Sequence, residues 1–137
     1  MKLSVQLFSR SFMVTWLAVM PAVLSGCGQR PITGGTSGAL LTDGNPIPDV
    51  LVHIYLTNAD TSLGYAVTSG DGTFELVAQD STGPLYLEPG SYIVVLESVG
   101  APTDLPAEYL DRDSTPLKME WASGDVLELN VPGLTLN

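Results

Sequence analysis

Short apolar stretches alternate along the chain with clusters of glycine, proline and aspartate from about residue 38 onward. Seven stretches of this kind cover 38–43, 50–57, 64–69, 73–78, 91–98, 117–122 and 126–131. Between the third and fourth stretches, Gly70-Asp71-Gly72 predicts a β-hairpin, because glycine and aspartate tolerate the positive φ of such turns. No segment has a convincing helical period. The spacing predicts an all-β fold, a seven-stranded antiparallel β-sandwich with Greek-key connections.

Period-two alternation predicts which side chains of these strands face the core. In 50–57, Val50, Val52, Ile54 and Leu56 share a wholly apolar face, and His53 lies on the opposite, less apolar one. The six residues predicted most firmly to point inward are Val52, Ile54, Phe74, Leu76, Tyr92 and Val94.

The first 25 residues have a different pattern, in which charge is confined to the beginning. Lys2 and Arg10 precede the uncharged stretch 11–25. This is the arrangement of a secretory signal peptide. A spanning helix needs about 20 apolar residues, and Pro21 and Gly26 interrupt this stretch, so a transmembrane anchor is the weaker interpretation.

The stretch ends in Leu24-Ser25-Gly26-Cys27, which resembles the lipobox of bacterial lipoproteins. The resemblance implies that Cys27 carries a thioether-linked diacylglyceryl group and that 1–26 is removed as a lipoprotein signal peptide. The acyl chains would anchor the protein in a membrane, since more than one chain gives stable attachment. Gly28, in place of aspartate, implies passage to the outer membrane of the cell envelope. Ordinary secretory cleavage beside a chance cysteine is the alternative.

Two parts are expected after Cys27, a lipidated tether over 27–37 and one folded domain over 38–137. Without 1–26, the cations Arg30, Arg112 and Lys118 face all 15 acidic residues, a net charge of −12 (3 minus 15). This balance excludes a nucleic-acid partner, which needs clustered Lys and Arg. A composition with 45% hydrophobic and 15% charged residues excludes disorder. The single cysteine excludes an internal disulfide.

Three stretches at the strand boundaries resemble motifs of the carboxypeptidase regulatory-like domains. They are Asp43-Gly44-Asn45-Pro46-Ile47-Pro48-Asp49-Val50 followed by Val52 and Ile54, then Thr68-Ser69-Gly70-Asp71-Gly72-Thr73-Phe74-Glu75-Leu76, and Leu87-Glu88-Pro89-Gly90-Ser91-Tyr92-Ile93-Val94-Val95. Together they span roughly 38–98 in the family's order. The resemblance implies a transthyretin-like, or prealbumin-like, sandwich that is accessory rather than catalytic. Ser69 stands where the family commonly has aspartate, and fold alone does not establish function.

Residues able to carry chemistry are few. No nucleophile motif, metalloprotease motif, P-loop or dinucleotide fingerprint occurs, so we expect no enzyme and no cofactor. The weak candidates for Ca²⁺ ligands are Glu108, Asp111, Asp113 and Glu120. Their spacing is not that of an EF-hand and Arg112 separates the two aspartates, so a solvated acidic loop is favoured over a metal site.

Two other features leave alternatives open. Some prealbumin-like modules form Lys–Asn cross-links, but strand alternation places Lys118 on a solvent-facing side, which disfavours a bond to Asn130. Five aromatic residues are candidates either for packing or for stacking on a sugar or a protein partner: Tyr55, Tyr65, Tyr86, Tyr109 and Trp121.

The sequence therefore predicts a lipid-anchored cell-envelope protein with a non-catalytic β-sandwich in a structural or binding role. Its expected partners are the membrane, through the acyl chains on Cys27, and an envelope protein or glycan. Two alternatives are a ligand-binding module for carbohydrate, peptide or calcium, and an envelope assembly accessory whose free sheet edge pairs with another chain.

Overall fold

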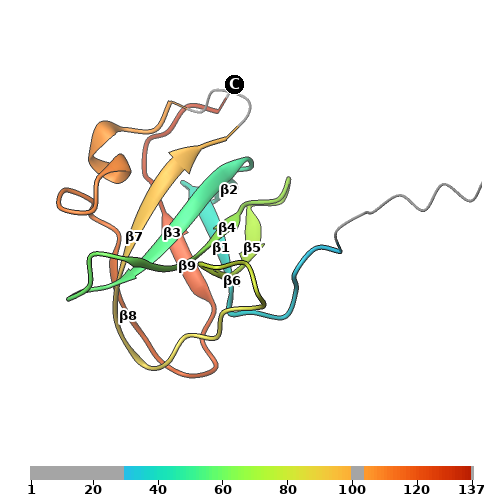
Figure 1. Ribbon diagram of the computed structural model, residues 1–137. Coiled ribbons are helices and arrows are strands. Elements are labelled where there is room, and N and C mark those ends of the chain that lie inside the picture. Colours follow the sequence, from blue (N-terminus) through green and yellow to red (C-terminus); the bar gives the residue numbers. More distant parts are fainter. Residues whose placement is uncertain (1–29, 100–103, 137) are drawn as a thin grey trace, which may run out of the picture.

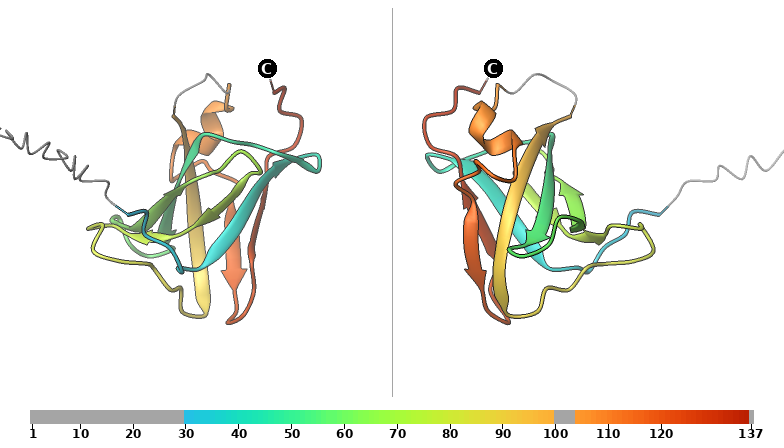
Figure 2. Two further views of the ribbon diagram at one scale, coloured as in Figure 1. Left: turned by 90° about the vertical axis from the view of Figure 1, so that its right-hand side faces the viewer. Right: turned by 60° about the vertical axis from the view of Figure 1, so that its left-hand side comes forward.

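The computed structural model describes residues 30–99 and 104–136, which form β-strands and one short 3₁₀ helix (Figure 1). This confirms the all-β prediction. The elements are β1 (Ser37–Thr42), β2 (Asn45–Pro46), β3 (Val50–Leu56), β4 (Ser62–Val67), β5 (Thr73–Glu75), β6 (Val77–Ala78), β7 (Gly90–Ser98), η1 (Ala107–Leu110), β8 (Lys118–Trp121) and β9 (Leu127–Asn130). They form two sheets that face each other (Figure 2).

One sheet has five strands in the order β6-β4-β3-β7-β8, and all its pairings are antiparallel. The other is built around β1, which pairs with β2, β5 and β9. The prediction of an entirely antiparallel sandwich is wrong at one place, because β1 and β9 are parallel. The chain leaves β8 in one sheet and crosses to β9 in the other. β9 therefore does not form a hairpin with the strand before it, and the crossing sets its direction parallel to β1.

The predicted hairpin at Gly70-Asp71-Gly72 is also corrected. The tight turn forms, with the amide of Gly72 donating to the carbonyl of Ser69 at 2.8 Å. The strands on either side, however, enter different sheets: β4 pairs with β3 and β6, whereas β5 pairs with β1. The reason is nonlocal, since the carbonyl of Gly72 accepts a hydrogen bond from Leu40 in β1 at 2.9 Å and draws the returning chain across.

The core lies between the sheets and contains all six residues predicted to point inward. The prediction for the apolar face of β3 holds for Val50, Val52 and Ile54 but is wrong for Leu56, which is 41% exposed. Leu56 is the last residue of β3, and the register of β3 against β4 shifts just before it, between Ile54 and Tyr55. Burying each large aliphatic side chain contributes about 1.5–3 kcal/mol.

The hydroxyls of three buried threonines form hydrogen bonds with backbone amide and carbonyl groups that the pairing of the strands leaves unpaired. The hydroxyl of Thr68 accepts from the amide of Val50 at 3.0 Å, and that of Thr42 accepts from the amide of Leu134 at 3.1 Å. The hydroxyl of Thr115 donates to the carbonyl of Val94 at 2.8 Å. Each bond ties a connecting segment to a strand, because an unpaired buried polar group would be costly.

The close approach of β1 and β5 gives a test of the packing. A Cβ on Gly38 would lie 2.3 Å from the ring carbon Cζ of Phe74 and 2.8 Å from the carbonyl oxygen of Leu127. We predict that Gly38→Ala lowers the free energy of unfolding by about 1–3 kcal/mol, measured by urea unfolding. Gly83→Ala is the control, since no atom lies within 4 Å of its added Cβ. Equal stability of the two variants would contradict the packing.

Candidate functional site

The residues of the predicted lipobox and anchor, Leu24, Ser25, Gly26 and Cys27, lie outside the described residues. The described chain begins at Arg30, three positions after the cysteine. In its two ranges, 30–99 and 104–136, no helix is both long enough and apolar enough to cross a membrane.

Hydrogen bonds fix the N-terminal segment from Gly34 onward, inside the stretch predicted as a tether. The amide of Thr36 donates to the carbonyl of Leu85 at 2.8 Å, and its carbonyl accepts from the amide of Leu76 at 2.9 Å. The Thr36 hydroxyl accepts a third bond from the amide of Leu87 at 2.9 Å. The amide of Gly34 also donates to a carboxylate oxygen of Glu75 at 3.0 Å. We call the three bonds of Thr36 the Thr36 clasp.

Gly35 shows how closely this segment is packed. A Cβ there would lie 2.0 Å from the carbonyl oxygen of Leu76 and 2.9 Å from that of Leu85. These neighbours are backbone atoms and cannot rotate away. A glycine is therefore needed where the segment enters the sandwich.

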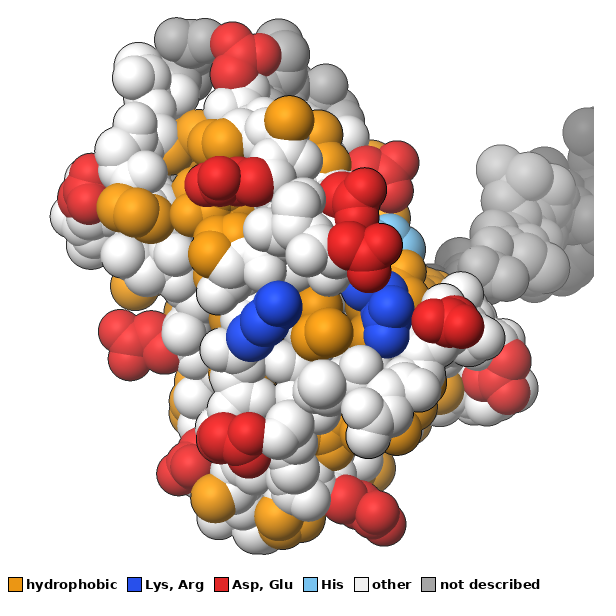
Figure 3. Space-filling model, turned by 90° about the vertical axis from the view of Figure 1, so that its left-hand side faces the viewer, with side chains coloured by type: hydrophobic (Ala, Val, Ile, Leu, Met, Phe, Trp, Pro, Cys, Tyr) orange, Lys and Arg blue, Asp and Glu red, His pale blue; other side chains and the backbone are white. Residues whose placement is uncertain are grey.

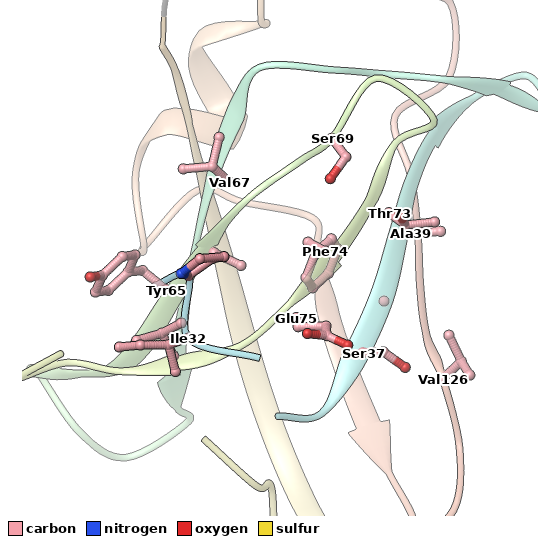
Figure 4. Close-up of a pocket in the computed structure, with 14 residues that line it drawn as sticks. Ile32, Ser37, Ala39, Tyr65, Val67, Ser69, Thr73, Phe74, Glu75 and Val126 are labelled. Carbon is pink, nitrogen blue, oxygen red and sulfur yellow. The ribbon is translucent and has the colours of Figure 1, made fainter. Parts of the chain in front are cut away.

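Beside this segment lies a shallow, mostly apolar groove of about 530 Å³ (Figure 4). We define the β4 groove by Ile32 from the N-terminal segment, Tyr65 and Val67 from β4, and Val77 from β6. An adjoining hollow of about 550 Å³ shares Ile32, Tyr65 and Val77, and is also lined by Arg30 and Ser81. The first groove continues past Phe74 to Val126.

Sequence reasoning missed the β4 groove, although its signal is in the sequence. Along β4 the inward positions are small, Gly64 and Ala66, and the outward positions are large, Tyr65 and Val67. A Cβ on Gly64 would lie 2.2 Å from the carbonyl oxygen of Val77, so the inner face has no room for larger side chains. The large side chains of β4 therefore point outward, and Val67 is 50% exposed.

The acidic candidates for calcium do not gather around one point. The carboxylate of Asp111 accepts a hydrogen bond of 2.8 Å from the amide of Asp113 in the same turn. The carboxylate of Glu120, on β8, instead accepts a hydrogen bond from the hydroxyl of Ser91. Glu108 is exposed on η1. In the part of the chain that the structure describes, no three His, Cys, Asp or Glu side chains form a group able to hold a metal ion.

Arg112 ties the acidic loop to the outer face of the five-stranded sheet. Its guanidinium lies 5.8 Å from the ring centre of Tyr55 and donates to the carbonyl of Thr57 at 3.2 Å. It also lies 3.4 Å from Asp60 and 3.8 Å from Asp113. On the face shown in Figure 3, basic side chains lie among scattered acidic ones. The Arg112 side chain therefore holds this loop against the sheet.

The remaining candidates have mixed surroundings. His53 is half-buried on the outer face of β3, with Nε2 3.5 Å from a carboxylate oxygen of Glu97. Of the five aromatic candidates, Tyr109 is buried in the core, Tyr86 is 67% exposed and the other three are intermediate. Lys118 and Asn130 are both exposed and belong to different sheets.

Two exposed turns share one hydrogen-bonded geometry. The carboxylate of Asp71 accepts from the hydroxyl of Thr73 at 2.6 Å and its amide at 3.1 Å, and Asp80 accepts from Thr82 at 2.7 and 3.1 Å. The threonine hydroxyl first, and then the amide, lowers the pKa of each aspartate. A lowered pKa favours the folded state at neutral pH, and this contribution is lost as the pH falls through the acidic range.

The matched turns provide an internally controlled prediction. In Thr73→Val the pKa of Asp71 should rise toward its ordinary value, because the hydroxyl that stabilises the carboxylate is gone, while the pKa of Asp80 stays lowered. Carboxyl ¹³C NMR titration of both residues measures this. An unchanged Asp71 pKa, or an equal rise at Asp80, would refute the hydrogen-bond explanation.

The chain was also compared with known proteins. No family model matches it, and no curated protein or solved structure is significantly similar to it. Any proposal for its function therefore rests on its own residues and their arrangement.

Proposed function

We propose that this chain is a lipid-anchored protein of the cell envelope whose β-sandwich has a structural or binding role and no catalytic one. The observation that carries the proposal is the position of the chain's single cysteine, Cys27, at the end of the lipobox-like Leu24-Ser25-Gly26. The hydrogen-bonded fold starts seven residues later, at Gly34. Such spacing suits an anchor joined directly to a folded domain. Gly28 supports an outer-membrane destination.

The fold is proposed to be the prealbumin-like, Greek-key form of the sandwich. Its support is that the motif residues lie at turns that need them. Asp43 and Gly44, in the turn from β1 to β2, have φ of 48° and 85°, and Gly72, before β5, has φ of 76°. The third motif leads into β7, which begins at Gly90. Positive φ favours glycine or aspartate at such positions.

The non-catalytic role is supported by the surroundings of the ionisable groups. A catalytic triad needs a nucleophile, a base and an orienting group in contact. His53 instead faces Glu97 on an exposed strand face, and the carboxylates of Asp111 and Glu120 are bonded to different parts of the chain. These contacts stabilise turns and strands.

An envelope assembly accessory is the second candidate, and a specific observation favours it. In the described ladders β8 pairs only with β7, and β9 pairs only with β1. Each strand therefore has one free edge, and another chain could extend a sheet by pairing there. We place a calcium ligand behind this candidate because, in the described residues, no three His, Cys, Asp or Glu side chains form a group able to hold a metal ion.

The anchor gives a direct prediction for cells that express the protein. Radiolabelled palmitate should label the wild-type chain, and Cys27→Ser should abolish labelling and shift the protein from the membrane to the soluble fraction. Ser25→Ala is the matched control, because it keeps a small residue beside the cleavage point and should be labelled normally. No palmitate on the wild type, with the Cys27→Ser protein still in the membrane fraction, would reject the anchor.

A further inference from the structure

We propose that the β4 groove is the face that this domain turns toward the lipid surface holding Cys27. The inference rests on the proposed lipidation and adds to it the orientation of the domain and its contact surface. The groove adjoins the point where the chain comes from its anchor, since Arg30 and Ile32 both line the hollow beside Tyr65.

The first step of the argument is the length of the link. Three peptide units join Cys27 to Arg30, so their Cα atoms lie at most about 11 Å apart. Arg30 lines a hollow together with Tyr65 and Val77. A lipid headgroup region at Cys27 is therefore within reach of this hollow.

The Thr36 clasp holds the start of the link on the domain even if the segment before it detaches. From Cys27 to Gly34 there are seven peptide units, or about 25 Å when fully extended. Neighbouring strands of a sheet lie about 4.8 Å apart, so the four intervals from β6 to β8 span about 19 Å. Lys118 lies on β8, at the opposite edge of the five-stranded sheet from β6. A fully extended link from Gly34 could span that distance, so it is the position of Arg30 in the hollow beside Tyr65 that favours the β4 groove over this edge.

The second step is the chemistry of the face. It includes the exposed aliphatic side chain of Val67 and the half-buried ring of Tyr65, whose hydroxyl is 2.6 Å from the hydroxyl of Ser81. An aromatic ring with a polar tip suits the boundary between headgroups and acyl chains. Arg30 adds a cation in an otherwise acidic protein.

The face that carries the β4 groove also differs from the rest of the surface in its charge. Of the residues that line the two hollows, Glu75 is the one acid, and its carboxylate is already bonded to the amide of Gly34. The face in Figure 3 instead carries many acidic side chains, which anionic headgroups repel. Asp80, exposed in the turn beside Ser81, remains ionised at neutral pH and keeps the contact at headgroup depth.

The experiment uses the lipidated full-length protein in vesicles of phosphatidylethanolamine and phosphatidylglycerol. Mass spectrometry first establishes the lipid on Cys27, which also blocks that thiol. A fluorophore is then attached to Val67→Cys or to the matched control Lys118→Cys, an exposed position at the other sheet edge. Lipids with a nitroxide on the headgroup should quench the Val67 probe several-fold more strongly than the Lys118 probe.

Each outcome has one meaning. Lipidated protein with equal quenching at both positions, or stronger quenching at Lys118, overturns the orientation and leaves the anchor intact. A Val67 probe that is shielded yet unquenched overturns it too, because a second copy or another protein then covers the groove. A chain without lipid on Cys27 overturns both the anchor and the orientation.

A variant tests the role of the link. Inserting twelve Gly and Ser residues after Gly28 should reduce quenching at Val67 toward the level at Lys118, because the longer link frees the domain to turn. Quenching at Val67 that stays unchanged would show that link length does not set the orientation.

Discussion

Burial of one face of each sheet against the other is the interaction on which the rest of this domain depends. The sequence supplies one cysteine, so no internal disulfide assists the packing. The sheets hold together through apolar side chains such as Ile54, Leu76 and Leu129, all fully buried. At Gly38 and Gly64 the packing leaves no room for a side chain. The same packing leaves the bulk of β4, at Tyr65 and Val67, on the outside.

The Thr36 clasp transmits this packing to the N-terminus. Its carbonyl and amide bond to Leu76 and Leu85, whose backbones are themselves paired, with the amide of Leu85 donating to the carbonyl of Leu76 at 2.9 Å. Thr36 therefore joins Leu76, which lies between β5 of one sheet and β6 of the other, to the loop that leads into β7. The clasp fixes where the chain leaves the sandwich, and so bears on which face would lie nearest the lipid that we propose on Cys27.

Prediction from sequence succeeded where the signal is local and failed where it is not. The period-two pattern identified the inward residues Val52, Ile54, Phe74 and Val94, because alternation follows from strand geometry alone. It misjudged Leu56, which follows a register shift between β3 and β4 that strand alternation alone does not reveal. Turn residues likewise revealed the Gly72 turn but not that its two strands belong to different sheets.

The sequence by itself determined the all-β class, the positions of the turns and the lipobox-like motif, since each depends on residues close together in the chain. Only the tertiary structure decided the parallel pairing of β1 with β9, the place where Gly34 and Thr36 join the fold, and the groove between Ile32 and Val67. These features arise from contacts between distant segments. Such contacts are set by the shared burial of two sheets, which no local pattern encodes.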